Sequence, residues 1–260
     1  MSTASPQSEF MTVALAAARR AAGISRGFYR SNLTVTTKAD QTPVTEADVA
    51  CEEAIRETIL DAFPEHGFYG EETGKTDSDS EFLWLVDPID GTKGFVRQYP
   101  FFSTQIALMK GGELILGVSS GTMFEELAWA EKGGGAWLNG DPLAVSDIAD
   151  PGRAAVSTGN LRSLAGSEGW GRLGGILAEA DRTRGYGDFY HYHLLAAGKI
   201  EAVIESDVNI LDIAALAVIV TEAGGVFTDL SGASPTLDTR SVLAANPALH
   251  AVYLDRLRGS

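Results

Sequence analysis

Cysteine, basic side chains and long apolar runs are all scarce in this chain of 260 residues. Cys51 is the only cysteine, so no intrachain disulfide can form, and a reducing, cytoplasmic location is predicted. Lys and Arg number 20 against 35 Asp and Glu, which gives a formal net charge of −15. That balance argues against nucleic-acid or anionic-membrane binding, because phosphate groups on such partners need a basic surface. A small phosphorylated substrate stays compatible, since a bound cation can reverse the local charge.

The most apolar long stretch, residues 210–220, is too short to cross a bilayer and contains Asp212. The N-terminus also lacks the basic-then-apolar pattern of a signal peptide. We therefore expect no membrane segment. Hydrophobic residues make up 45% of the chain and charged residues 21%, which is typical of globular proteins.

The first part of the chain, residues 8–142, is predicted to form an α+β unit. Apolar residues recur at helical spacing over 9–30 and 45–63, with Ser8 as a plausible N-cap of the first helix. Strand patterns separated by Gly-rich turns then follow, which favours antiparallel hairpins. The strand patterns cover 67–70, 82–87, 104–109, 114–119, 126–130 and 135–138.

The second part, residues 143–258, has a different rhythm that is typical of α/β structure. Its strand patterns alternate with amphipathic or apolar helical patterns. The predicted strands are 154–157, 184–186, 202–205 and 242–245. The predicted helices are 167–180, 190–197, 212–223 and 247–257.

The most informative segment is Trp84-Leu-Val-Asp-Pro-Ile-Asp-Gly-Thr-Lys-Gly-Phe95. An apolar strand pattern ends there in Asp87 and Asp90, three residues apart, and the intervening Pro88 stiffens the backbone while Gly91 allows a close approach. Two carboxylates on a rigid turn are suitable ligands for a hard cation such as Mg²⁺. An ordinary strand-end turn with common turn residues is the alternative.

Other acids also stand where elements begin or end. Glu71 and Glu72 follow a strand pattern, Asp48 falls in the first turn of the helix after Thr45, and Asp212 precedes an apolar helix. Taken singly, Asp48 and Asp212 are explained by helix capping. Taken together, acids from separate elements tolerate one another's charge only if cations lie among them.

Four motifs resemble those of the inositol monophosphatase-like family, in the same order and over essentially the whole chain. They are Lys38-x-Asp40-x-Thr42-Pro-Val-Thr45-x-x-Asp48, Gly70-Glu-Glu72, Asp87-Pro-Ile-Asp-Gly-Thr92, and Asp212-x-Ala-Ala with Glu222-Ala-Gly-Gly225. The resemblance implies a layered αβαβα sandwich of the inositol monophosphatase/fructose-bisphosphatase type. It also implies Mg²⁺-dependent, lithium-sensitive hydrolysis of small phosphate monoesters, commonly by a homodimer.

The family pattern implies two or three Mg²⁺ ions per site. By position, Glu71, Asp87 and the carbonyl of Ile89 would hold the first ion. The second would be held by Asp87, Asp90 and Asp212. Glu71 would also support a third, weaker ion together with water.

Catalytic roles follow from the same resemblance. Asp48 and Thr92 would orient and deprotonate the attacking water, and Glu71 would contribute through the third ion. Backbone amides of Gly91 and Thr92 would bind the phosphate. One position departs from the pattern: Leu211 stands where the family usually has an aromatic residue, typically tryptophan. The adjoining metal ligand is kept, so activity is expected to survive.

Within the family the sequence is more similar to histidinol-phosphate phosphatases. The features are Asp90-Gly-Thr-Lys-Gly-Phe-Val-Arg97 with Pro100, and Arg184-Gly-Tyr-Gly-Asp188-Phe. Asp188 and Glu205 could neutralise or hydrogen-bond the amine and imidazole of histidinol phosphate. They could equally accept hydroxyls of inositol phosphate, the first alternative substrate; 3′-phosphoadenosine 5′-phosphate is the second. A non-catalytic, metal-binding or regulatory protein of the same fold is the alternative from another class.

His191-x-His193 suggests a metal site at first sight. If this stretch is helical, however, side chains two residues apart point about 200° apart and cannot chelate one ion. We therefore expect packing or substrate contact from these histidines.

Overall fold

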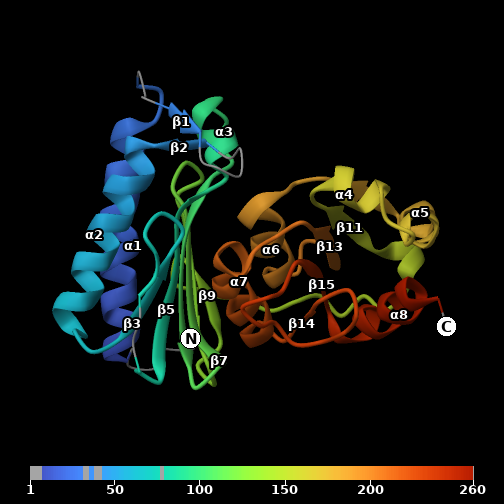
Figure 1. Ribbon diagram of the computed structural model, residues 1–260. Coiled ribbons are helices and arrows are strands. Elements are labelled where there is room, and N and C mark those ends of the chain that lie inside the picture. Colours follow the sequence, from blue (N-terminus) through green and yellow to red (C-terminus); the bar gives the residue numbers. More distant parts are fainter. Residues whose placement is uncertain (1–7, 32–34, 38–42, 77–78, 260) are drawn as a thin grey trace.

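Helices and sheets of the chain stack in five layers, as Figure 1 shows for the computed structural model. The structure describes residues 8–31, 35–37, 43–76 and 79–259. The layers are α1 (Glu9–Phe28) with α2 (Glu46–Ala62), a large sheet, α6 (Asp188–Ala196) with α7 (Ile210–Glu222), a smaller sheet, and α5 (Trp170–Glu179) with α8 (Pro247–Arg258). The predicted αβαβα sandwich is confirmed.

The large sheet has eight strands within the described residues, in the order β10-β9-β8-β7-β6-β5-β3-β4. The strands are β3 (Gly67–Gly70), β4 (Gly74–Lys75), β5 (Phe82–Asp90), β6 (Ser103–Lys110), β7 (Glu113–Gly121), β8 (Glu126–Glu131), β9 (Ala136–Leu138) and β10 (Asp141–Pro142). β3 runs parallel to β5, and the other neighbours are antiparallel. A short antiparallel pair, β1 (Val35–Thr37) and β2 (Pro43–Thr45), leads into α2.

The smaller sheet has the order β12-β11-β13-β15-β14 among the described residues. Its strands are β11 (Ala155–Thr158), β12 (Arg182–Arg184), β13 (Ala202–Ser206), β14 (Val226–Thr228) and β15 (Ser241–Ala245). β11 is parallel to both of its neighbours, whereas β15 is antiparallel to both of its own. The short helices are α3 (Thr92–Val96), a 3₁₀ turn at Pro151–Arg153, and α4 (Leu161–Ala165).

Helix α7 is the central element of the molecule. It is apolar on nearly every face because it packs against the large sheet on one side and β14 of the smaller sheet on the other. Gly117 on β7 permits this close approach, since a Cβ atom there would lie 2.3 Å from the carbonyl oxygen of Ala215. The start of α7 is thereby held rigidly beside the end of β5.

Several boundaries differ from those predicted. Asp87 and Asp90 do not stand in a turn after the strand: β5 continues through an irregularity between them, and Asp90 pairs with Ser103. The strand expected at 184–186 lies at Arg182–Arg184, because Tyr186 N–H donates to the Ser157 hydroxyl instead. The helix expected from Tyr190 begins at Asp188. Short elements such as α3 and β14 were not predicted, because so few residues show no periodicity.

Of the helices in the described ranges, none combines the length and apolar character needed to cross a membrane. Cys51 packs inside α2 with no exposed surface, and its burial raises the thiol pKa to about 12. Cys51 is therefore a packed side chain and a poor nucleophile.

Candidate active site

An acidic pocket of about 460 Å³ opens where β5, α3 and the start of α7 meet. Carboxylates from both halves of the chain line it, with two cationic side chains at its mouth. The charged lining residues are Glu71, Asp87, Asp90, Asp188, Asp207, Asp212, Lys93 and Arg97. Six carboxylates against two cations make the pocket strongly attractive to positive charge.

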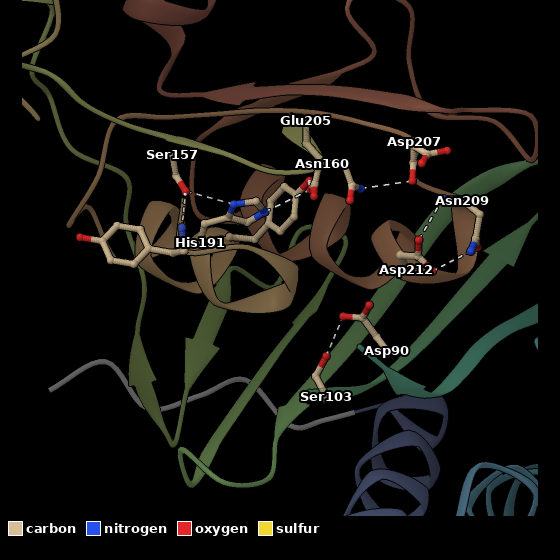
Figure 2. Close-up of polar contacts among 11 residues, drawn as sticks. Asp90, Ser103, Ser157, Asn160, His191, Glu205, Asp207, Asn209 and Asp212 are labelled. Atoms are coloured by element: carbon tan, nitrogen blue, oxygen red, sulfur yellow. Dashed lines mark hydrogen bonds and ion pairs between the residues drawn. The ribbon is translucent and has the colours of Figure 1, made fainter. Parts of the chain in front are cut away.

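Asp87, Asp90 and Asp212 form the centre of this pocket. One carboxylate oxygen from each lies within 4.8 Å of the others. Asp87 Oδ1 is buried and has no hydrogen-bond partner among the described residues. Figure 2 shows Asp90 and Asp212 lying across from each other at this point, although they come from β5 and α7. Distant parts of the chain are thus brought together as predicted.

The pKa values of these acids are raised by burial and by their mutual repulsion. The pKa of Asp87 is raised well above its ordinary value, first by burial and then by the charges of Glu71, Asp90 and Asp212. Burial, together with nearby acids, has the same effect on the pKa of Asp90. For Asp212 burial raises the pKa to about 7, against the opposing hydrogen bond from Asn209 N–H. Without a counter-charge, burial and repulsion favour the protonated forms of these acids.

Strand pairing places Glu71 beside Asp87. Gly70 on β3 pairs in parallel with Val86 on β5, and Glu71 N–H donates to the Val86 carbonyl at 3.1 Å. The next residue on each strand is an acid, so the register itself sets the two carboxylates side by side. Their proximity is also expressed in the raised pKa of Asp87.

Glu52 holds the turn that carries Glu71. It is buried on α2, and its two carboxylate oxygens accept the backbone N–H groups of Glu72 and Thr73, both at 2.8 Å. Gly70 is required there, because a Cβ atom would lie 2.4 Å from the Glu52 carboxyl carbon. Glu52 was not predicted from the sequence. Its signal was an acid four residues after Asp48 on the same, otherwise buried, face of α2.

Asp48 and Thr92 form a second polar pair at the pocket. The Thr92 hydroxyl lies 3.1 Å from Asp48 Oδ1 and 3.0 Å from the Ile89 carbonyl oxygen. Asp48 Oδ2 accepts the Thr45 N–H at 2.8 Å and the Thr45 hydroxyl at 2.5 Å. Burial raises the pKa of Asp48 despite these bonds, so the group is suited to accept a proton.

Asp212 is fixed in a matching way at the start of α7. Asn209 caps the helix, and its N–H and side-chain amide donate to the two oxygens of Asp212 at 3.0 and 2.7 Å. Leu211, between them, is 4% exposed and packs in the main core. A leucine at this position therefore leaves the orientation of the Asp212 carboxylate intact.

Gly91 shapes the corner between β5 and α3. Its φ is 87°, and a Cβ atom would lie 2.9 Å from the Phe101 carbonyl oxygen. The backbone can take this path only with glycine. The first amides of α3 have no partner within the helix and are available to an anion.

The far wall of the pocket comes from the smaller sheet and its loops. Three of its polar residues, Asn160, Asp188 and Asp207, have φ values of 49°, 45° and 58°. Such backbone strain in non-glycine residues is concentrated at functional sites. In Figure 2 the Asn160 amide donates to the Asp207 carbonyl, which joins two of these loops.

Asp188 and Glu205 approach each other at this wall. The pKa of Asp188 is raised to about 6, first by burial of its carboxyl group and then by the negative charge of Glu205. Glu205 lies behind, in an adjoining cavity of about 50 Å³ that Asp90 and Asp188 also line. Glu205 Oε2 accepts the Tyr192 hydroxyl at 2.8 Å and lies 3.2 Å from His191 Nε2.

The two histidines point to different partners, as the helical spacing predicted. His191 Nδ1 lies 3.2 Å from the Ser157 hydroxyl, on the side of Glu205. His193 contacts Ser119 and Glu126 on the large sheet. They form no shared metal site.

The sequence-predicted site residues therefore line one pocket and its adjoining cavity, with Asp48 behind Thr92. Lys38, Asp40 and Thr42 of the first motif lie outside the described residues. Like Glu52, Asn209 and Ser103 were not predicted from the sequence. Asn209 is an N-cap residue whose position relative to Asp212 was readable from the sequence; Ser103, which donates to Asp90 Oδ2 at 3.0 Å, carries no local signal.

Comparison with known proteins agrees with this geometry. The sequence model of the inositol monophosphatase family matches residues 6–259. The chain belongs to the inositol monophosphatase family. A histidinol-phosphatase of Mycobacterium tuberculosis is 38% identical over 259 residues, covering 95% of this chain and 97% of the relative. An inositol-1-monophosphatase of Caulobacter vibrioides is 34% identical over 255 residues, covering 94% of this chain and 99% of the relative.

A solved structure gives the same result. The extragenic suppressor protein SuhB of Bartonella henselae superposes with a TM-score of 0.89 at 30% identity, covering 97% of this chain and 100% of that one. The family and these relatives identify the chain as a phosphatase that hydrolyses phosphate monoesters. The metal dependence of the family matches the aspartate cluster.

Proposed function

We propose that the chain is a Mg²⁺-dependent phosphatase whose substrate is histidinol phosphate. The observation that carries the proposal is the meeting of Asp87, Asp90 and Asp212 beside a second acidic wall built around Asp188. The first group is suitable for metal ions, and the second is suitable for a cationic leaving group. The half 8–142 would supply most metal ligands, and the half 143–258 would supply Asp212 and the substrate wall.

The donor atoms suit Mg²⁺. They are hard carboxylate oxygens within 4.8 Å of one another, including the partnerless Asp87 Oδ1. Glu71, Asp87 and the Ile89 carbonyl would hold one ion, and Asp87, Asp90 and Asp212 a second; Glu71 would support a third. When bound, Mg²⁺ polarises the phosphate and stabilises the leaving oxygen.

The chain's own groups would then orient water and phosphate. The Thr92 hydroxyl is fixed between Asp48 and the Ile89 carbonyl, so it can accept a proton from the attacking water while passing its own to Asp48 Oδ1. Amides at Gly91 and Thr92 would hold the phosphate oxygens. Attack by water yields the alcohol and inorganic phosphate directly.

Substrate choice rests on charge. Histidinol carries an amine and an imidazole, whereas inositol is a neutral polyol. Asp188, Asp207 and Glu205 give the substrate wall three carboxylates with which a cationic leaving group can pair. A relative named histidinol-phosphatase is 39% identical to this chain and one named inositol-1-monophosphatase is 34% identical, so inositol monophosphate is the second candidate.

Turnover of histidinol phosphate, inositol monophosphate and 3′-phosphoadenosine 5′-phosphate by the purified protein, with Mg²⁺, with chelator and with added Li⁺, tests the proposal. We expect phosphate release that needs Mg²⁺, is inhibited by Li⁺ and is fastest with histidinol phosphate. A higher kcat/KM for inositol monophosphate than for histidinol phosphate would reject histidinol phosphate as the substrate. Full activity in chelator would reject the dependence on Mg²⁺. A homodimer and a cytoplasmic location stay predictions; gel filtration tests the first.

A further inference from the structure

Buried polar side chains line the face of the large sheet that looks toward α6 and α7. Ser103 and Gln105 lie two residues apart on β6, and Gln105 pairs across the strands with Ser119 on β7. All three are at most 1% exposed. The same face continues with Ala107 and Met109, which pack in the core as expected. Burying three neutral polar groups side by side is unfavourable unless each is satisfied.

A continuous series of hydrogen bonds joins these groups, and we name it the relay; of their side-chain polar atoms, only Gln105 Oε1 has no hydrogen-bond partner among the described residues. Gln105 Nε2 donates to Ser103 Oγ at 2.8 Å and to Ser119 Oγ at 3.1 Å. Ser103 donates to Asp90 Oδ2 at 3.0 Å, the contact drawn in Figure 2. At the other end Ser119 Oγ lies 2.9 Å from His193 Nε2, and His193 Nδ1 lies 2.7 Å from Glu126 Oε2.

The donors in the relay can be assigned from chemistry alone. A carboxylate only accepts, so Glu126 accepts a hydrogen bond from His193 Nδ1–H, and in a neutral imidazole Nε2 is then an acceptor for the Ser119 hydroxyl. At the opposite end Asp90 accepts the Ser103 hydroxyl. The two hydrogens of the Gln105 amide then fill the remaining acceptor on each serine. One orientation of every group is thus selected, from Glu126 to Asp90.

The relay ends at a group that matters for the reaction. The Ser103 hydroxyl donates a hydrogen bond to Asp90 Oδ2, which leaves the second oxygen of the Asp90 carboxylate for a cation. His193 belongs to α6, whose first residue is Asp188 on the substrate wall. The hydrogen-bonded series therefore links Asp90 on the metal side of the pocket to α6, the helix that begins at the substrate wall.

We propose that Gln105, Ser119 and His193 are positioning residues that fix the Asp90 carboxylate for metal binding through Ser103. The proposal rests on the proposed function, in which Asp90 is a metal ligand. Groups that orient a ligand in this way commonly change metal affinity by about 10- to 100-fold when they are removed. The relay also explains why a histidine with no direct pocket contact is buried at this position.

Calorimetric Mg²⁺ titration of four proteins tests the relay: the wild type, Ser103→Ala, Ser119→Ala and the double variant. We expect Ser103→Ala to weaken Mg²⁺ binding about tenfold. Ser119→Ala should weaken it severalfold in the wild type and have no further effect in the Ser103→Ala background, because the connection to Asp90 is already broken. His193→Phe should behave as Ser119→Ala does.

Ser120→Ala is the matched control, since Ser120 is the neighbouring buried serine on β7, and the alternation of the strand turns it to the opposite face. It should leave Mg²⁺ affinity unchanged, and melting temperatures report whether each variant folds. Equal effects of Ser119→Ala in both backgrounds, or no effect in either, would overturn the relay. Gln105→Met, which removes both donors, repeats the test should Ser119→Ala fail to fold. A wild type that binds no Mg²⁺ would instead overturn the proposed function, and the relay with it.

Discussion

Asp48 and Asp212 occupy the same position on two different helices. Each is the third residue of its helix, and each accepts the backbone N–H of its N-cap residue, from Thr45 at 2.8 Å and from Asn209 at 3.0 Å. Capping and site function are therefore not alternatives for these acids. The cap holds the carboxylate in one rotamer, and the positive end of the helix favours its charge. Two helix starts thus deliver rigid acids to one pocket.

Asp90→Asn is expected to lower kcat by about three orders of magnitude or more. The amide cannot replace a carboxylate at the cation, and several kcal/mol of transition-state stabilisation depend on that ion. The fold should stay intact. In chelator the variant should melt at a higher temperature than the wild type, because burial and neighbouring acids raise the Asp90 pKa and disfavour its charge.

Phosphate release and thermal melts of the same preparations check this prediction. Asp238→Asn, on an exposed loop far along the sequence, controls for loss of one negative charge. A decrease of only a few-fold in kcat for Asp90→Asn would remove Asp90 from the metal ligands.

The sequence could reveal the acids of the candidate site but not the residues that support them. Asp87, Asp90 and Glu71 stand at strand ends, and Asp48 and Asp212 at helix starts, so local pattern identified all five. Ser103 and Gln105 read as ordinary strand residues, and only the pairing of β6 with β5 and β7 gives them a role. Register between distant strands is a tertiary property, and no local periodicity encodes it.

The same reason explains the boundary errors. The stretch from Asp87 to Gly91 contains proline and glycine signals that favour a turn, yet Asp90 still pairs with Ser103 on β6. Tyr186 was expected in a strand, but a hydrogen bond from its N–H to Ser157 takes it out of the sheet. Long amphipathic helices such as α1 and α2 were placed within about two residues, because their periodicity is repeated over several turns.

Glu52→Ala is expected to weaken Mg²⁺ binding about tenfold without touching the pocket. The change leaves the N–H groups of Glu72 and Thr73 without their acceptor, so the turn that carries Glu71 loses its support. Stability should fall by about 1–3 kcal/mol, the usual cost of such a loss. Calorimetry and denaturant titration measure the two effects. Glu53→Ala, the exposed neighbour on α2, is the control, and equal losses from both variants would contradict the role of Glu52.

Stability in chelator should fall as the pH rises from about 4 to about 7. Asp188 and Asp212 have pKa values raised to about 6 and about 7 by burial and neighbouring acids, so the folded chain binds more protons than the unfolded chain in this range. Mg²⁺ must displace protons from the cluster, and its stabilising effect should therefore grow over the same window. Melting curves at several pH values, with chelator and with Mg²⁺, measure both trends. If the protein in chelator gained stability between pH 5 and pH 7, about one unit either side of the Asp188 pKa, this account would be contradicted.

Gly91→Ala is expected to reduce both stability and activity. The φ of 87° is strained for alanine, and the new Cβ would press on the Phe101 carbonyl oxygen at 2.9 Å. We expect a loss of about 1–3 kcal/mol, with lower kcat because the amides proposed to bind phosphate move. Gly111→Ala, at a φ of 55° in open space, isolates the backbone strain from the contact. Equal losses of activity in the two variants would show that the Gly91 corner has no special role.

Asp188→Asn is expected to change which ester is preferred while leaving the metal site intact. Asp188 lines the pocket on the wall opposite α3, and a hydrogen bond between its carboxylate and a cationic group is worth about 1.5–3 kcal/mol. Losing that charge should lower kcat/KM for histidinol phosphate by about 10- to 100-fold. Inositol monophosphate, which offers only hydroxyls, should lose much less, because an amide oxygen still accepts them. Steady-state kinetics with both esters and a Mg²⁺ titration of the variant give the comparison, with Asp207→Asn as a second substitution on the same wall. Equal losses for the two esters would mean that Asp188 supports the fold of the wall and does not select the substrate by charge.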